Sequence, residues 1–349
     1  MSIFRDVYRL LSQGKALALA TVVATRGSTP QVAGAMMVVN SDASTVGTVG
    51  GGNVEKLITE DAILTLRENR PMLKDYFLTE GGNTEMVCGG KMQVFIEPVR
   101  EEKDFFEGLD NEARSGKPSA LSTIISGKEI FSSFTGKKIL ITSNGATVGS
   151  LGMEKIDKLV IPEALKAVKE GSPRLKMYTL EETKKQEVTI FINVIPGEAN
   201  LIIAGGGHIA KPLSEMAKVL GFNVTIVDDR KEYANKSRFP LADETIWGDF
   251  RKVFSNLTLS ENSNVVVVTY GHRYDKQVLE EVLRSKAGYV GCIGSKRKAK
   301  QTLEYLKSAG YSEEDVKRVH IPVGLNIRAK TPAEISLSIL GEIVEERRK

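Results

Sequence analysis

The chain is poor in cysteine and histidine. Of its 349 residues only two are cysteines, Cys88 and Cys292, and three are histidines. Two cysteines do not make a disulfide framework, and they fit a reducing compartment. The histidines lack the spacing of metal ligands, and the chain has no cysteine–cysteine–histidine set. We therefore predict no zinc site and no other bound metal ion.

Long apolar runs are also missing. No run approaches the roughly 18 residues that a membrane-spanning helix needs. The apolar stretch 16–24 resembles the core of a signal peptide, but Asp6 precedes it and residues 3–11 have helical periodicity. These features favour a helix followed by a buried strand. We expect a cytoplasmic protein with no membrane partner.

The chain has little excess of charge of either sign. It carries 48 lysines and arginines against 44 aspartates and glutamates, which leaves a net charge of +4. No arginine-rich stripe with interleaved aromatic residues occurs, so we expect no nucleic-acid partner. We detect no internal repeat, no low-complexity tract, no G-x-S-x-G elbow and no complete Walker motif.

Glycine, by contrast, is abundant, and one glycine cluster follows an apolar strand. Residues 201–204 read Leu-Ile-Ile-Ala, and Gly205, Gly206 and Gly207 come directly after them. With Ala210 they form the G-x-G-x-x-G/A pattern of a dinucleotide-binding turn. The helical pattern 211–220 that follows would direct its positive end at a phosphate.

The context of this turn supports a Rossmann-type βαβ unit. A second strand, 223–227, ends at Asp228, at the distance where an acid usually binds the ribose 2′-hydroxyl. The alternative is a glycine turn that packs a helix on a sheet without a nucleotide, because a fold does not guarantee its ligand.

The length of the chain predicts two or three domains. We expect a glycine-rich N-terminal domain over 1–100, a middle α+β segment over 101–196 that completes the N-terminal region, and a Rossmann-like domain over 197–349. The break follows from Pro196 and Gly197. The predicted fold class is therefore α/β: a mixed α+β domain, then a doubly wound parallel sheet.

The predicted strands differ between these regions. In the middle segment, 119–125, 129–134 and 138–143 look like antiparallel strands separated by short turns. In the last domain, strands near 201, 223, 244, 264, 289 and 319 alternate with helical patterns. That alternation is typical of a parallel sheet.

Two further glycine clusters lie in the first hundred residues. Gly50, Gly51 and Gly52 precede a helical pattern, so their backbone N–H groups are candidates for binding an anion. A tight strand-to-helix turn is the alternative. Gly89 and Gly90 follow Cys88 in a predicted loop, where backbone amides can lower the pKa of a thiol. Cys88 is thus a candidate reactive or ligand-binding thiol, or else a small packed side chain.

The remaining candidates are basic side chains and one more cysteine. His208 lies in the predicted phosphate turn, either as a phosphate donor or as a local cap. His272 follows a strand of the last domain at the end where ligands bind. Lys296 starts a helical pattern, where a cation opposes the helix dipole unless an anion binds there; a solvated basic face is the alternative. Cys292 has a core pattern.

Taken together, these motifs resemble the XdhC/CoxI family, the accessory proteins of xanthine dehydrogenase and related molybdenum hydroxylases. The resemblance covers nearly the whole chain. The motifs that carry it are Gly27-Ser28-Thr29-Pro30, Gly34-Ala35-Met36-Met37, 47–55, Val87-Cys88-Gly89-Gly90, Gly205-Gly206-Gly207-His208, Val227-Asp228-Asp229-Arg230, 289–295 and 322–327.

The resemblance implies a cofactor chaperone more than a turnover enzyme. Such proteins bind the molybdenum cofactor, which in bacteria sometimes carries a nucleotide, protect it, support its sulfuration and deliver it to the apo-dehydrogenase. A cysteine desulfurase and a second copy of the chain are further implied partners. The chain departs from the family pattern at Gln31, where arginine is expected, and at Asn53, where a small or acidic residue is more usual.

Two other functions compete with this one. An oxidoreductase could use NAD(P) in the C-terminal fold, with His272 and Tyr274 as proton donors, although no convincing acid–base pair is visible. A non-catalytic subunit whose glycine loops serve only assembly is the third. The glycine clusters and Cys88 favour the cofactor carrier, in which Asp228 is a weaker candidate than the glycines.

Overall fold

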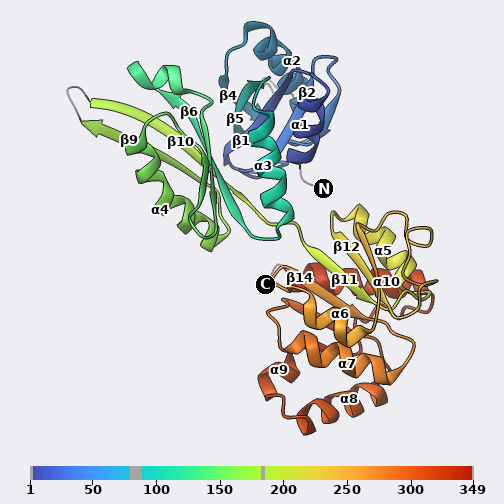
Figure 1. Ribbon diagram of the computed structural model, residues 1–349. Coiled ribbons are helices and arrows are strands. Elements are labelled where there is room, and N and C mark those ends of the chain that lie inside the picture. The colour runs from blue at the N-terminus through green and yellow to red at the C-terminus, as the bar shows by residue number, and fades with distance from the viewer. Residues whose placement is uncertain (1–2, 79–88, 182–184, 348–349) are drawn as a thin grey trace. The chain divides into compact units, whose positions relative to one another are not determined.

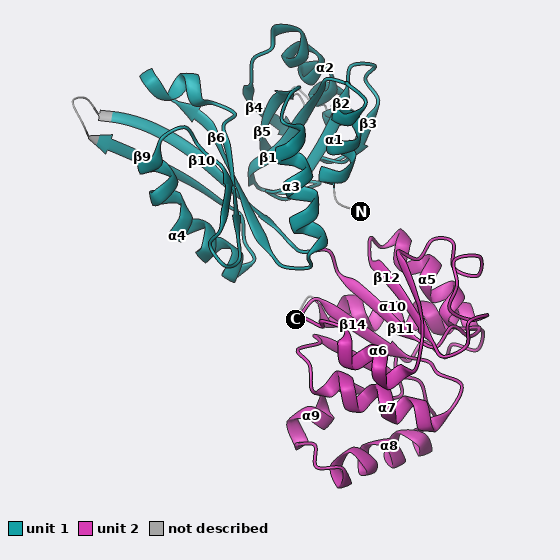
Figure 2. Ribbon diagram, viewed as in Figure 1, with its two compact units in different colours: residues 1–197 teal, residues 198–349 magenta. Residues whose placement is uncertain are grey.

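The structure is a computed structural model that describes residues 3–78, 89–181 and 185–347. The chain divides into two compact units, unit 1 over 1–197 and unit 2 over 198–349 (Figure 2). Within the described ranges, every helix is too short or too polar to cross a membrane.

Unit 1 contains two five-stranded antiparallel sheets (Figure 1). The first has the strand order β3-β2-β1-β5-β4, and the second has the order β8-β7-β6-β10-β9. The strands of the first sheet are β1 (Leu17–Arg26), β2 (Met36–Asn40), β3 (Thr45–Gly47), β4 (Met72–Leu78) and β5 (Gly90–Val99). Those of the second are β6 (Ser119–Gly127), β7 (Lys138–Thr142), β8 (Thr147–Gly149), β9 (Arg174–Glu181) and β10 (Lys185–Ile195).

The two sheets pack face to face between helices. In β1, Leu17 and Leu19 face the second sheet, while Ala18 and Ala20 face helix α2 (Gly52–Glu68). Such alternation is the normal pattern of a strand with two different faces. Helix α4 (Glu154–Glu170) covers the outer face of the second sheet in the same way. The helices α1 (Ile3–Ser12) and α3 (Lys103–Arg114) pack on each other beside the inner faces.

Unit 1 is a structural duplication. Its first half runs α1, β1, β2, β3, α2, β4, β5, and its second half repeats that order as α3, β6, β7, β8, α4, β9, β10. Strand β8 begins 102 residues after β3, and both read Thr-Val-Gly. Helices α2 and α4 have 17 residues each and end at residues with left-handed backbone, Asn69 and Gly171.

The turns before α2 and α4 are held by equivalent hydrogen bonds. In the first half, the Glu55 carboxylate accepts from the Thr48 hydroxyl and from the Val49 backbone. In the second half, Asp157 accepts from the Ser150 hydroxyl and, at 2.8 Å, from the Leu151 backbone. The same carboxylate clamp thus closes the same turn twice.

Two of the sequence predictions for unit 1 are wrong. We predicted no internal repeat. The sequence does not reveal the duplication, because the two halves share burial and topology but only short stretches of identical residues. We also predicted a strand over 129–134, which is the 3₁₀ helix η1 (Glu129–Phe134). Phe131 is fully buried under the second sheet and packs against Gly127. Burial of this side chain favours a helical turn over an extended strand. The predicted strands around it are present as β6 and β7.

Unit 2 contains a six-stranded parallel sheet with the order β13-β12-β11-β14-β15-β16. This confirms the predicted Rossmann-like unit. Its strands are β11 (Asn200–Ala204), β12 (Asn223–Asp228), β13 (Glu244–Trp247), β14 (Ser263–Val267), β15 (Tyr289–Cys292) and β16 (Val319–His320). Its helices are α5 (Ala210–Val219), α6 (Phe250–Asn256), α7 (His272–Leu283), α8 (Lys296–Ser308), α9 (Glu313–Lys317) and α10 (Pro332–Glu346).

Both faces of this sheet are covered, which explains its continuous apolar strands. In β11, Leu201 and Ile203 belong to the core with α5 and α10, whereas Ile202 and Ala204 belong to the core with α6 and α7. The strand order reverses between β11 and β14. Ligands of open parallel sheets bind at the carboxyl end of the strands at such a point.

Candidate functional site

Three glycine motifs of the first half pack directly on one another, and we call their meeting point the glycine corner. It consists of the turn Gly27–Pro30, the turn Gly50–Gly52 and the pair Gly89–Gly90. A Cβ atom at Gly50 would lie 2.6 Å from the Pro30 ring, and one at Gly90 would lie 2.1 Å from the Ser28 carbonyl oxygen. Gly50 and Gly90 are therefore required by close packing.

Three of the other four glycines of the corner have open space where a Cβ atom would lie. Gly51, Gly52 and Gly89 have φ angles of 71°, 61° and 71°, a left-handed backbone that favours glycine. A Cβ atom at any of them would meet no described atom within 4 Å. Gly51 caps α2 without a side-chain hydrogen bond. At the positive end of this 17-residue helix, no described atom fills the space beside Gly51 and Gly52.

Some amides of the corner are already engaged by Glu55. Burial alone would raise the pKa of Glu55, but hydrogen bonds from Thr48 and from the backbone of 49–51 outweigh it and hold the pKa below its usual range. An anion bound at the corner would therefore meet the first turn of α2 rather than these amides.

The sequence candidate Cys88 lies outside the described residues. Its neighbour Gly89 donates its backbone N–H to the Leu78 carbonyl, at 2.7 Å. Gln31, one of the two departures from the family pattern, is half-buried next to the corner, and its carbonyl accepts from the Thr29 hydroxyl. Asn53, the other departure, is exposed in the first turn of α2.

The second half has no such corner within its described residues. Where the first half has Gly51 and Gly52, it has Met153, with a φ of −142°, and Glu154, the first residue of α4. Where the first half has an open turn at 27–31, it has η1. The start of α4 thus has side chains in place of the two glycines, and one of them is an acid at the helix end that an anion would otherwise favour.

In unit 2, two of the three glycines in the Rossmann turn are required by packing. A Cβ atom at Gly205 would lie 2.5 Å from the Val268 carbonyl oxygen, and one at Gly206 would lie 2.2 Å from the Tyr233 carbonyl oxygen. A Cβ atom at Gly207 would meet no described atom within 4 Å, and the neighbouring His208 is exposed. The open part of the turn is therefore Gly207–His208 at the entry to α5.

Asp228 is fully buried, and both of its carboxylate oxygens are engaged. Oδ2 accepts from the Gly206 backbone at 2.7 Å, and Oδ1 accepts from Arg230 Nε at 2.9 Å. Burial would raise the pKa of Asp228, but these hydrogen bonds outweigh it and keep the pKa below its usual range. The acid that holds a ribose in nucleotide-binding relatives of this fold instead joins the turn to Arg230.

Two tyrosines fix Arg230 in that position. Its guanidinium carbon lies 3.7 Å from the centre of the Tyr233 ring and 4.0 Å from that of Tyr270. The Tyr270 hydroxyl donates to Asp229 at 3.0 Å. Sequence reasoning noticed the run Asp228–Arg230 but missed both tyrosines, because Tyr270 belongs to the segment after β14 and no spacing rule connects it to Arg230.

The sheet brings several predicted residues to one edge. Gly207 follows β11, Asp228 ends β12, His272 follows β14, and Lys296 follows β15. These four strands are neighbours in the sheet. His272 and Lys296 are exposed at the first residues of α7 and α8.

The same edge contains a buried polar pair that sequence reasoning missed. Lys298 Nζ lies 2.6 Å from Asp275, and the Thr269 hydroxyl donates to the same carboxylate. Cys292 is buried beside them. Burial, with Asp275 adding to it, raises the pKa of the Cys292 thiol to about 12, which keeps it protonated and supports the packing role predicted for it.

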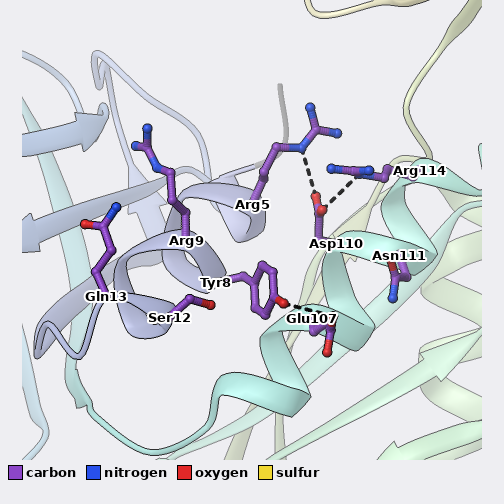
Figure 3. Close-up of a pocket in the computed structure, with 9 residues that line it drawn as sticks. All are labelled: Arg5, Tyr8, Arg9, Ser12, Gln13, Glu107, Asp110, Asn111 and Arg114. Carbon is purple, nitrogen blue, oxygen red and sulfur yellow. Dashed lines mark hydrogen bonds and ion pairs between the residues drawn. The ribbon is translucent and has the colours of Figure 1, made fainter. Parts of the chain in front are cut away.

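A separate groove of ≈ 570 Å³ lies between α1 and α3, and none of the site residues predicted from the sequence lines it (Figure 3). At its floor, Asp110 lies 3.5 Å from Arg5 Nε and 2.9 Å from Arg114 Nε, while the Tyr8 hydroxyl donates to Glu107. Arg5 corresponds to Glu107 and Tyr8 to Asp110 in the two halves. The contact between Arg5 and Asp110 is therefore the equivalent of the contact between Glu107 and Tyr8. An approximate two-fold axis that relates the two halves of unit 1 passes through the groove.

The fold and the turns together define a two-unit α/β protein: a duplicated antiparallel unit with one glycine corner, followed by a Rossmann-like unit. The XdhC and CoxI family model matches residues 10–76 and 112–179, one segment in each half of unit 1. The XdhC Rossmann domain model matches residues 201–343. The chain belongs to the XdhC and CoxI family.

The chain is also similar to several named proteins. The chain is 29% identical to the uncharacterized protein YqeB of Escherichia coli over 60% of its length, and it spans 40% of that protein. It is 26% identical to a protein of Bacillus subtilis named as a probable xanthine dehydrogenase subunit, over 97% of this chain and 96% of the relative. It is 21% identical to the molybdenum cofactor insertion chaperone PaoD of Escherichia coli, over 99% and 88%.

A solved structure shares the fold. A crystal structure described as a xanthine dehydrogenase from Bacillus halodurans superimposes with a TM-score of 0.77, at 23% identity, and covers 100% of this chain and 96% of that one.

Proposed function

We propose that the protein binds the molybdenum cofactor, protects it, supports its sulfuration and delivers it to a molybdenum hydroxylase of the xanthine dehydrogenase type. Family membership and the similarity to a protein named as a molybdenum cofactor insertion chaperone support this role. In this role the protein is a carrier rather than a turnover enzyme.

The glycine corner is the observation that carries the proposal. Only one of two equivalent turns keeps bare glycines, and it is the turn that contains the family's motifs. The cofactor is an anionic pterin dithiolene with a phosphate. The uncovered start of α2, with Gly51 and Gly52, suits a ligand that needs close approach to the backbone and a positive helix end.

We assign further contacts to residues at both turns. Gly50 and Gly90 would shape the corner, and Gly89 would leave room beside the ligand. In unit 2, Gly207 and His208 would receive a phosphate at the start of α5, whereas Gly205, Gly206 and Asp228 would hold the turn in place. His272 and Lys296 would add positive charge at the same edge of the sheet. When bound, the cofactor supplies a soft metal centre, which a thiolate such as that of Cys88 suits as a ligand.

An NAD(P)-dependent oxidoreductase is the second candidate, and the Rossmann turn is the observation that favours it. The buried Asp228–Arg230 contact weighs against it, because a ribose hydroxyl would have to compete with a guanidinium for the same carboxylate. We therefore rank a nicotinamide cofactor below the molybdenum cofactor. A cysteine desulfurase and a second copy of this chain are the further partners that we propose.

The deciding experiment is metal and pterin analysis of the protein purified from a host that makes the cofactor, followed by calorimetry with NAD(H). We expect molybdenum and pterin to copurify and no tight nicotinamide binding. The Cys88→Ala variant should keep the fold and lose cofactor retention or dehydrogenase activation. Tight nicotinamide binding without pterin would reverse our ranking, and unchanged activation by Cys88→Ala would remove that thiol from the proposal.

A further inference from the structure

Unit 2 carries a concentration of basic side chains on three neighbouring helices. We call it the basic surface and define it as Arg251 on α6, His272, Arg273 and Lys276 on α7, and Lys296 and Arg297 on α8. Four of these residues line or flank a groove of ≈ 460 Å³ that also includes Glu280 and Tyr305. The other two begin α8, which Lys298 joins to α7 through its 2.6 Å contact with Asp275.

The acids in this region are already neutralised. Glu280 pairs with Arg251 and accepts from the Tyr305 hydroxyl, so both of its oxygens are engaged. Asp275 is buried against Lys298. Within the described ranges, Arg273, Lys276, Lys296 and Arg297 form no ion pair. The surface therefore has a positive charge that nothing described in the chain balances.

Beyond His272 and Lys296, which we assign to the phosphate, the arrangement fits a protein partner better than a small anion. A site for one phosphate collects buried donors around one point. Here the cations extend from three helices, and Arg273, Lys296 and Arg297 are exposed. Exposed charges of one sign act over several ångströms in water and steer the encounter with an oppositely charged surface.

The groove also lacks a platform for nucleic-acid bases. Tyr305 is the aromatic ring that lines this groove. The centre of its ring lies 3.8 Å from Lys276 Nζ, so the lysine already covers one face of the ring. Binding of single-stranded nucleic acid relies on stacking of bases on open aromatic rings. Carboxylates, by contrast, match the forked donors of Arg273 and Arg297.

We infer that the basic surface docks an acidic segment of the enzyme that receives the cofactor. This inference rests on the proposed function for the identity of the partner, but the surface itself does not. Helices α7 and α8 start at the same end of the sheet as Gly207, after β14 and β15, the two strands that follow β11 in the strand order. Docking there would place the recipient beside the turn that we assign to the phosphate.

The first test is independent of the proposed function and uses a fluorescein-labelled deca-glutamate peptide as the probe. In fluorescence anisotropy at low salt the full chain binds the peptide, and binding weakens as salt is added. The Arg273→Glu/Lys276→Glu variant should bind about tenfold more weakly, with a flatter salt dependence. The Lys166→Glu/Lys169→Glu variant makes the same charge change on α4, at exposed lysines of unit 1, and should bind like the wild type.

Equal binding by both variants would overturn the inference. So would stronger binding of a labelled RNA duplex or single strand that depends on Arg273 and Lys276, because the surface would then serve nucleic acid.

The second test measures binding to the apo-dehydrogenase of the same organism and the transfer of cofactor to it. We expect the Arg273→Glu/Lys276→Glu variant to retain wild-type molybdenum and pterin but to bind and activate the apo-enzyme about tenfold less well at low salt. Loss of retention with unchanged binding would assign these cations to the cofactor and overturn the docking role. If the wild type binds the apo-enzyme through this surface yet carries no cofactor, the proposed function fails and the docking surface stands.

Discussion

The two halves of unit 1 have the same topology and the same carboxylate-clamped turn, and they differ at one corner. The first half leaves the start of α2 bare, with Gly51 and Gly52, whereas the second half places Met153 and Glu154 before and at the start of α4. The fold therefore does not require glycine at these two positions. It requires the clamp, Thr48 with Glu55 and Ser150 with Asp157, which both halves keep.

This comparison separates what the architecture needs from what a ligand needs. The connection between β4 and β5 is also longer, 11 residues against three between β9 and β10, and it contains Cys88. These differences in the turns and connections of the two halves thus fall at one place. A duplicated scaffold with one altered corner is the form expected when one copy binds and the other supports.

The halves also differ in the polar contacts between their sheets, and this difference gives the largest predicted effect. Lys138 is buried between Glu97 and Glu102, at 2.9 and 2.8 Å, whereas Met36 takes the equivalent position in the first half. Lys138→Met leaves the Glu97 carboxylate buried without its cation. We expect the free energy of unfolding at pH 8 to fall by about 3–5 kcal/mol, measured with urea.

The matched control is Glu97→Asn/Lys138→Met, because Asn193 is the counterpart of Glu97. It gives both sides the same residues and should recover much of the loss. A loss below about 1 kcal/mol in Lys138→Met would show that the ion pair does not hold the sheets together.

The same pair predicts a dependence of stability on pH. Burial, only partly offset by Lys138, raises the pKa of Glu97 to about 7 from an ordinary value of 4.5. Between these values the folded state binds the proton more tightly than the unfolded state. The free energy of unfolding should therefore fall as the pH rises through this window, by about 3 kcal/mol. Urea unfolding at pH 5, 6, 7 and 8 measures the slope, and Glu97→Gln should flatten it; an unchanged slope contradicts the assignment.

Exchanging the two corners tests the comparison directly. Gly51→Met/Gly52→Glu gives the first half the residues of the second, puts side chains on left-handed backbone and adds an acid where we place an anion. We expect the amount of copurified molybdenum and pterin to fall by about tenfold or more, equivalent to about 1.4 kcal/mol of binding free energy. The reverse exchange, Met153→Gly/Glu154→Gly, should leave retention unchanged. Equal losses in both variants would mean that the corner has no special role.

The smallest effects are expected at the groove on the approximate two-fold axis (Figure 3). Tyr8→Phe removes an exposed hydrogen bond to Glu107 and should cost less than about 1 kcal/mol. Asp110→Asn weakens the equivalent contact, in which a buried carboxylate holds Arg5 and Arg114, and should cost about 1–2 kcal/mol. Thermal unfolding compares the two variants; a larger loss in Tyr8→Phe would contradict the role given to burial.

Much of unit 2 could be predicted because its signals are local. The apolar run of β11, the glycine turn and the acid at the end of β12 each occupy a short stretch of sequence, and the alternation of strands and helices implies a parallel sheet. The contact that redirects Asp228 was not predictable in the same way. It depends on Arg230 being stacked between Tyr233 and Tyr270, residues from different strand ends.

The duplication of unit 1 was missed because the two halves share a pattern of buried positions and few identical residues. Leu17 and Leu19 correspond to Ser119 and Leu121, and only the clamped turns stay similar at the level of single residues. The segment 129–134 misled us because an apolar–polar pattern of six residues fits a strand as well as a short helix. The burial of Phe131 decided between them.

By itself, the sequence determined most of the helices and strands, the parallel sheet of unit 2 and three glycine turns, because periodicity, apolar runs and positive-φ residues act over a few neighbours. Only the tertiary structure decided that Gly50 packs on Pro30 and Gly90 on Ser28, that the second half has no matching corner in its described part, and that Arg230 takes the acid of the Rossmann turn. These contacts join residues far apart in the chain, and their free energy exists only once the strands between them have paired.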